Sequence, residues 1–161
     1  MKKVMFSIVS ILFTAQLMAQ GSQIKSDVAF KDAKMELAYN NYLQLKDALV
    51  ASKAEAAKEA AIRLKTSLAS VKESKNAINE TTKIANASNI DEIRKTFASL
   101  STQMTTIVKG GQLEKGMLYL EYCPMANNNT GAYWLSNEKE IKNPYFGDKM
   151  LKCGSVKEMI H

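Results

Sequence analysis

Apolar side chains recur every three or four residues through most of the first two thirds of the chain. Between residues 30 and 50 they form a stripe of Met35, Tyr39, Tyr42, Leu45 and Leu49. A second stripe, between residues 54 and 78, consists of Ala57, Ala61, Leu64, Leu68 and Val71. A third begins at residue 90 and consists of Ile90, Ile93, Phe97, Leu100, Met104, Ile107 and Val108. This spacing is typical of amphipathic helices that bury one face, so the pattern predicts about three long helices.

Polar residues and glycines at the ends of these stripes indicate where the helices begin and stop. Ser52 and Glu55 have the spacing of a capping box, and Asn89 together with Glu92 can cap the third helix. The double glycine at 110–111 is a strong stop signal. Long helices with short connections favour an antiparallel bundle over residues 30–111. We expect this bundle to hold together on its own.

The pattern changes after the double glycine. Residues 117–122 (MLYLEY) are short and aromatic, which predicts a strand, and residues 132–135 (AYWL) predict a second one. The intervening NNNTG at 127–131 predicts a turn, and SNEKEI at 136–141 predicts a capped helical turn. The fold class is therefore mainly α: a helical bundle with a small, turn-rich C-terminal module containing short strands, over residues 112–161, packed on the bundle.

The first residues have the layout of a secretory signal. Lys2 and Lys3 precede an apolar run at 4–13, and AQLMAQ at 15–20 offers cleavage after Ala19. The apolar run is shorter than a membrane span requires. We expect a signal peptide at 1–19, a flexible lead-in at 20–29 and a periplasmic mature protein with no stable membrane insertion.

Charge and histidine content narrow the function. The formal net charge is +6, with acidic residues interleaved among the basic ones, which is typical of a solvated surface and not of a nucleic-acid footprint. The only histidine, His161, ends the chain, so the usual general base is missing and no Ser/His/Asp or Cys/His arrangement can be assembled. The sequence predicts a protein that is not an enzyme.

Two short sulfur pairs are the best indication of function. Cys123 lies two residues before Met125, and Cys153 lies three residues after Met150. Thiolate and thioether sulfurs are soft donors that select ions such as Cu(I) or Ag(I). The four residues are therefore candidate metal ligands, with the two thiolates as primary donors.

The same two cysteines allow a second interpretation. An oxidising compartment favours disulfides, and two cysteines make one possible bridge. Closing a loop between Cys123 and Cys153 would stabilise the fold by about 3–4 kcal/mol in the chain-entropy model. A structural or interaction module with this disulfide and no metal is the alternative hypothesis.

Several motifs carry a resemblance to a known family. YCPMA, GAYWLS, NPYFG and MLKCG, between Tyr122 and Gly154, resemble a bacterial family of exported domains of unknown function, and YLQLKDALVAS and RKTFASL extend the similarity upstream. Such domains occur alone or fused to the periplasmic adaptor subunits of Cus-type heavy-metal efflux pumps. The Tyr-Cys-Pro-Met portion is similar to the adaptors' metal-binding segment, with Ala126 where that segment has histidine. The resemblance implies copper or silver handling and a partner in a heavy-metal efflux system.

Overall fold

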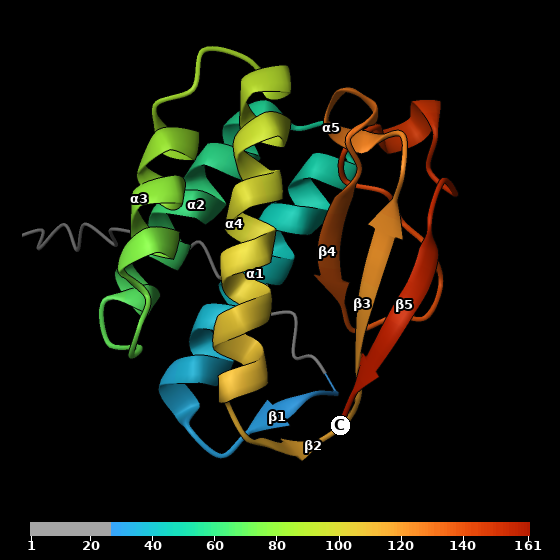
Figure 1. The fold of residues 1–161 in the computed structure, drawn as a ribbon. Helices are drawn as coiled ribbons and strands as arrows, with labels where there is room; N and C mark the ends of the chain where they lie inside the picture. Colours follow the sequence, from blue (N-terminus) through green and yellow to red (C-terminus); the bar gives the residue numbers. More distant parts are fainter. Residues whose placement is uncertain (1–26) are drawn as a thin grey trace, which may run out of the picture.

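The computed structural model describes residues 27–161. The predicted signal peptide, and the predicted lead-in up to residue 26, lie outside the described residues. Four helices of eleven residues or more occur in the described part, in the order α1 (Ala33–Val50), α2 (Ala54–Leu68), α3 (Lys75–Ala85) and α4 (Ile90–Gly110). They lie side by side and a small antiparallel sheet lies to one side of them (Figure 1). The mainly α class is confirmed.

The second predicted helix is two helices. The chain leaves α2 at Leu68 and begins α3 only at Lys75, where one helix was expected to run from 54 to about 78. The Ser74 hydroxyl donates to the carbonyl oxygens of Leu68 (2.7 Å) and Val71 (2.8 Å). Glu73 adopts a left-handed conformation with φ 57°. The Ser74 hydroxyl thus satisfies the last carbonyl of α2 and the left-handed Glu73 turns the chain, so four helices occur where about three were expected.

The helix-end signals have mixed outcomes. The Asn89 side chain accepts hydrogen bonds from the backbone N–H groups of Asp91 and Glu92, both at 3.0 Å, and α4 ends at Gly110 as predicted. The capping box at Ser52 does not form. Lys53 is the N-terminal cap residue of α2, without a side-chain cap, and the Ser52 hydroxyl instead accepts a hydrogen bond from Arg94 at 3.0 Å.

The sheet at the C-terminal end has the order β4-β3-β5, with both pairings antiparallel. Its strands are β3 (Leu118–Cys123), β4 (Ala132–Ser136) and β5 (Ser155–Ile160). The first two confirm the predicted strands, whereas the sequence analysis missed β5. Residues 137–140 are bends, so the predicted helical turn at 136–141 is wrong. A four-residue helical turn, α5 (Ala126–Asn129), and a short 3-10 helix, η1 (Gly147–Lys149), complete this region.

A second, two-stranded sheet brings the ends of the described chain together. It pairs β1 (Ala29–Phe30) with β2 (Leu113–Lys115), and β3 follows β2 after Gly116. Gly116 has φ 92°, and a Cβ there would lie 2.7 Å from the Asp27 carbonyl oxygen, so this close approach requires glycine. At the start of β3, Leu118 pairs with Ile160 of β5.

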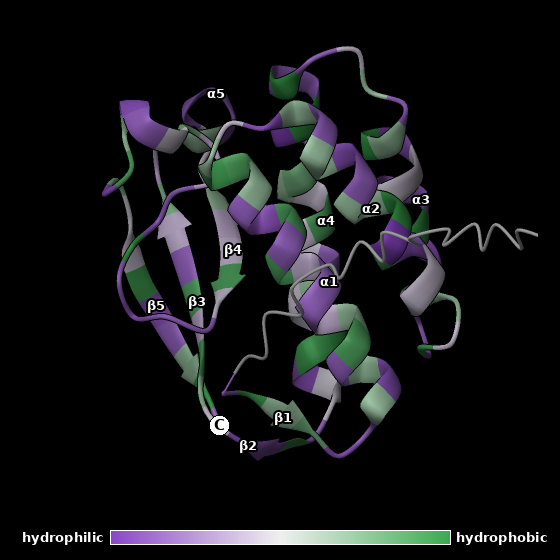
Figure 2. Cartoon of the chain, turned by 180° about the vertical axis from the view of Figure 1, so that it is seen from behind, coloured by the Kyte–Doolittle hydropathy of each residue, from purple (hydrophilic) through white to green (hydrophobic). Residues whose placement is uncertain are grey.

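The helices and the C-terminal sheet share one hydrophobic core. Buried residues of α1, α2, α4, β3 and β4 belong to a single contact cluster. Figure 2 shows green apolar segments on the helices and on the strands of the sheet. A chain of neighbouring aromatic rings, with centroids 5.5–6.3 Å apart, crosses this core in the order Phe30, Tyr39, Tyr42, Phe97, Tyr145 and Trp134. The Tyr42 hydroxyl accepts a hydrogen bond from the Leu135 amide at 3.1 Å. The core of the C-terminal region is therefore continuous with that of the helices.

Candidate functional site

The fold brings the two cysteines together. Cys123 is the last residue of the central strand β3, where it pairs with Ala132 of β4 and is fully buried. Cys153 is half-buried in the segment just before the edge strand β5. Their Sγ atoms lie 2.6 Å apart, well inside the roughly 3.5–4.0 Å of ordinary non-bonded contacts. A small movement would bring them to the bonding distance of about 2.05 Å found in a disulfide.

Backbone and side-chain hydrogen bonds position Cys153. Its amide donates to the Met150 carbonyl oxygen at 3.0 Å and closes a turn between these residues. The buried side chain of Asn143 donates to the Cys153 carbonyl oxygen at 2.7 Å. The next residue, Gly154, has φ 144°, and a Cβ there would lie 2.8 Å from the Trp134 ring. The Gly154 backbone packs directly against the indole ring of Trp134 and has little room to move, so the end of the turn is held in place.

The contact between the sulfurs disfavours ionisation of Cys153. The hydrogen bond between the sulfurs, followed by partial burial, raises the pKa of the Cys153 thiol from its ordinary 9.0 to about 11. At neutral pH the Cys153 thiol is therefore protonated. An ion that binds its sulfur has to displace this proton.

The two predicted methionine ligands belong to the two segments that hold the cysteines. Met150 is the first residue of the turn that ends at Cys153, and it is half-buried. Met125 follows Cys123 after one residue, and its side chain is 45% exposed. It also lines an open cavity of about 810 Å³ between the N-terminal end of α4, α5 and η1. All four predicted sulfur ligands thus come from two segments that meet at the cysteine contact.

The geometry as it stands does not hold an ion between the thiols. Two thiolates that bind one ion at about 2.3 Å each, in tetrahedral geometry, have sulfurs about 3.8 Å apart. The observed 2.6 Å is shorter, so the sulfurs must separate before an ion can enter. Within residues 27–161, no group of three or more His, Cys, Asp and Glu side chains could hold a metal ion. A site of three or more side-chain ligands here would have to include the thioethers.

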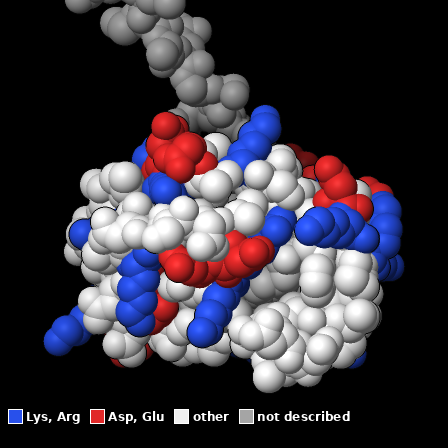
Figure 3. Space-filling view, turned by 90° about the horizontal axis from the view of Figure 1, so that it is seen from above, with Lys and Arg blue, Asp and Glu red and all other residues white. Residues whose placement is uncertain are grey.

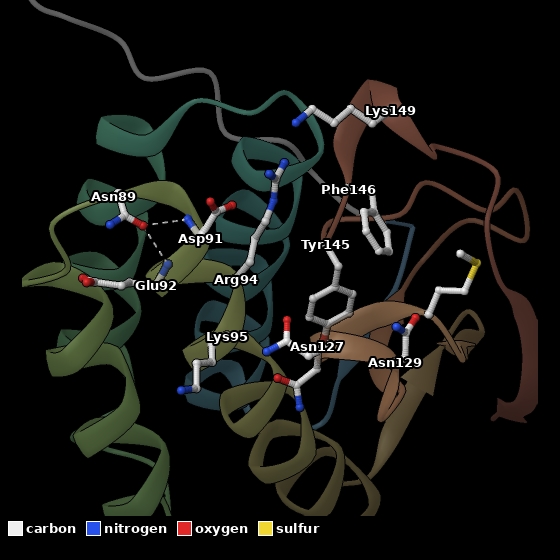
Figure 4. A pocket seen from close by; sticks show the side chains of 12 residues that line it. Asn89, Asp91, Glu92, Arg94, Lys95, Asn127, Asn129, Tyr145, Phe146 and Lys149 are labelled. Carbon is white, nitrogen blue, oxygen red and sulfur yellow. Dashed lines mark hydrogen bonds between the residues drawn. The ribbon is translucent and has the colours of Figure 1, made fainter.

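Part of the lining of the cavity beside Met125 binds the protein itself (Figure 4). The Arg94 guanidinium donates to the carbonyl oxygens of Pro144 (3.0 Å) and Leu49 (3.2 Å), and to Ser52. Arg94 thereby joins α4 to the end of α1 and to the NPYFG segment. The amides at the start of α4 are capped by Asn89. The cavity is also lined by the charged side chains of Asp91, Lys95 and Lys149 and by exposed asparagines at 127–129.

The charges on the face seen in Figure 3 do not single out a binding surface, because Lys and Arg side chains are intermixed with Asp and Glu there. Several charged side chains of the described residues form exposed ion pairs, such as Lys58 with Glu55 at 3.0 Å and Lys83 with Glu80 at 2.8 Å. Exposed pairs of this kind contribute little to stability. No helix of the described residues is both long and apolar enough to cross a membrane.

Glu121 is the residue that the sequence analysis passed over. Its side chain is fully buried, on the same face of the sheet as Cys123 and as Trp134, its partner in β4. Burial raises the pKa of this carboxyl from 4.5 to about 8, although the Lys46 charge and the Trp134 N–H lower it. Among the described residues, neither Glu121 carboxyl oxygen has a partner at hydrogen-bonding distance and angle, and neither does the Tyr39 hydroxyl. A buried carboxylic acid therefore lies at the junction of sheet and helix α1.

These features define a helical protein with an appended sheet and a sulfur site at the end of that sheet. Residues 38–116 match the family described as "Protein of unknown function (DUF3347)". The matched part begins inside α1 and ends after β2, so it covers the helices and stops before the four sulfur residues and the motifs from Tyr122 onwards. No curated protein and no solved structure matches the chain.

Proposed function

We propose that this protein is an exported, non-catalytic binding protein for a soft monovalent ion, Cu(I) or Ag(I). One observation carries the proposal: folding brings together two thiols that are 30 positions apart, each with a methionine next to it. Cys123 and Cys153 supply the thiolates, and Met125 and Met150 supply thioethers, which are the donors that such ions prefer. The helices are the scaffold and the surface for a partner.

The cellular role is part of the same proposal. The signal-like N-terminal residues support export to the periplasm, and the motif resemblance supports a role in heavy-metal efflux or buffering. A component of an efflux system is the corresponding partner. The Met125 side chain is the most exposed of the four sulfur ligands and would be the first that an arriving ion meets.

A titration of the reduced protein with Cu(I) against a chromophoric competitor tests the proposal. Cys123→Ser and Cys153→Ser should each abolish tight binding, because a hydroxyl is a poor donor to a soft ion. Met125→Leu and Met150→Leu should weaken binding and leave the melting temperature almost unchanged, because Leu and Met have similar volumes. Met159→Leu is the matched control, since Met159 is 55% exposed on β5 and should bind copper as the parent does. Absence of copper binding by the reduced parent would refute the proposal.

A second candidate function is favoured by the short distance between the sulfurs. A Cys123–Cys153 disulfide would join the central strand β3 to the segment before β5 and make the protein a stapled interaction module without metal. In that case either cysteine substitution lowers the free energy of unfolding by about 2–5 kcal/mol, and the methionine substitutions change nothing. The mass of the isolated protein, lighter by two hydrogen atoms and without metal, would indicate this state.

A further inference from the structure

The distance between the two sulfurs has a consequence for how the site is controlled. A shared ion requires the sulfurs to be at least about 3.8 Å apart, whereas a disulfide requires about 2.05 Å, and the observed 2.6 Å lies between the two. One pair of sulfurs cannot satisfy both distances at once. Ion binding and disulfide formation at Cys123 and Cys153 are therefore mutually exclusive states of one site.

We propose that Cys123 and Cys153 form a thiol–disulfide switch that opens and closes the ion site. This inference rests on the proposed function. The reduced pair takes the ion, the oxidised pair excludes it, and a bound ion in turn protects the thiols from oxidation. This reciprocity follows from linkage, because a ligand that binds only one state stabilises that state.

The structure indicates which half of the site moves. Cys123 belongs to the central strand, where β4 and β5 pair on either side of β3, so its backbone is held in place. Cys153 lies outside every strand of the described chain, in the turn that starts at Met150. Because Asn143 and Trp134 hold the backbone of residues 153 and 154, the sulfurs separate through rotation of the Cys153 side chain together with a displacement of the turn before it. Met150 moves with Cys153, so the same displacement also brings its thioether into or out of position.

The exchange chemistry has a defined order. Cys153 is half-buried and Cys123 is fully buried, so a small disulfide reaches Cys153 first. The Cys153 thiolate attacks that disulfide, a mixed disulfide forms on Cys153, and one thiolate leaves. The Cys123 thiolate then attacks the Cys153 sulfur and releases the second thiolate. The two protein thiols are oxidised, the external disulfide is reduced to two thiols, and these take up the two protons.

Native mass spectrometry with Ag(I) tests the switch, because Ag(I) is not itself oxidised under these conditions. The protein is prepared reduced, and oxidised with oxidised glutathione. We expect the reduced form to bind one Ag(I), the oxidised form to be two hydrogen atoms lighter and to bind none, and reduction to restore binding. Reduced protein already loaded with Ag(I) should resist the glutathione disulfide.

The outcomes separate the two proposals. If neither form binds Ag(I), the proposed function fails. If both forms bind Ag(I) equally, or if the disulfide does not form although both thiols are present, the switch is refuted. The proposed function is then judged only by whether the reduced form binds Ag(I).

Single-cysteine variants test the order of attack without any metal. Cys123→Ser leaves the half-buried Cys153, which should form a mixed disulfide with oxidised glutathione in the native protein. Cys153→Ser leaves the buried Cys123, which should react only after unfolding in urea. Equal reaction of both native variants would contradict the assignment of Cys153 as the first sulfur attacked.

Discussion

Replacement of Glu121 by glutamine should change how the stability of the protein depends on pH. The carboxyl is fully buried, and its pKa is raised from 4.5 to about 8. In the unfolded chain the group ionises near pH 4.5, whereas in the folded protein it keeps its proton up to about pH 8. Between these pH values ionisation of the carboxyl lowers the free energy of the unfolded state, whereas the folded state stays protonated and is not stabilised. The stability of the fold therefore falls as pH rises through this range.

The size of the effect follows from these two pKa values. Each unit is worth about 1.4 kcal/mol, so the full difference between 4.5 and 8 corresponds to about 5 kcal/mol, of which roughly 3 to 4 kcal/mol is lost between pH 5 and pH 8. Glutamine has the same shape and no charge to lose. Its extra N–H donors can cost about 1–3 kcal/mol if they stay unpaired, but this cost does not depend on pH.

Urea denaturation at pH 5, 6, 7 and 8, followed by the fluorescence of the only tryptophan, Trp134, measures the effect. The reduced parent should lose stability relative to Glu121→Gln by roughly 3 to 4 kcal/mol across the series. Glu114→Gln, the same substitution at an exposed position of β2, is the control and should follow the parent. A constant difference between parent and Glu121→Gln at all four pH values would refute the reasoning.

Three further predictions concern the links between the helices and the C-terminal region. Gly147→Ala should lower the melting temperature and reduce the free energy of unfolding by at least about 1–3 kcal/mol, because φ at this position is 56° and the new Cβ would lie 2.5 Å from the Ser52 hydroxyl. Gly110→Ala is the control, since a Cβ there would have nothing within 4 Å, and this variant should melt at the parent temperature or slightly higher. Arg94→Lys should lower the free energy of unfolding in urea by about 1–3 kcal/mol, because an ammonium cannot bond three acceptors on two segments as the guanidinium does; an unchanged midpoint would show that these bonds contribute nothing. A fragment that ends at residue 111 should lose its cooperative thermal transition in circular dichroism, since Tyr42 and Phe97 then lack the partners they have in Leu135 and Tyr145; a sharp transition would restore the expectation of a bundle that folds alone.

Hydrophobic periodicity predicted helices where the apolar stripe is continuous and the ends carry local signals. Helices α1 and α4 meet both conditions, and Asn89 caps α4 through contacts within three residues. The break between α2 and α3 was missed because residues 69–74 look compatible with a helix. It depends on the Ser74 hydroxyl and on the left-handed Glu73, neither of which a periodic pattern reveals.

The sheet and the site show the same limit for long-range contacts. β5 is an edge strand with mostly exposed side chains and a register shift opposite Leu120, so its sequence lacks the alternation that identifies a strand. The sequence showed which sulfurs could act together, but their contact depends on the pairing of β3 with β5. Glu121 looked like an ordinary carboxylate because its burial is imposed by Trp134 and by helix α1, which are remote in sequence.

The two ends of the described chain lie close together, because Asp27 contacts Gly116 and Ile160 pairs with Leu118. This proximity determines how the fold can be built into larger proteins. In Figure 1 the C-terminus lies beside the start of β1. A unit whose ends emerge at one place can be inserted into a loop of another protein, or joined to one at either end, without stretching its own core. The sulfur site lies at the opposite end of β3, so a host attached at the chain ends would not cover it. The architecture therefore suits a transferable domain with the proposed sulfur site at the end away from its attachment.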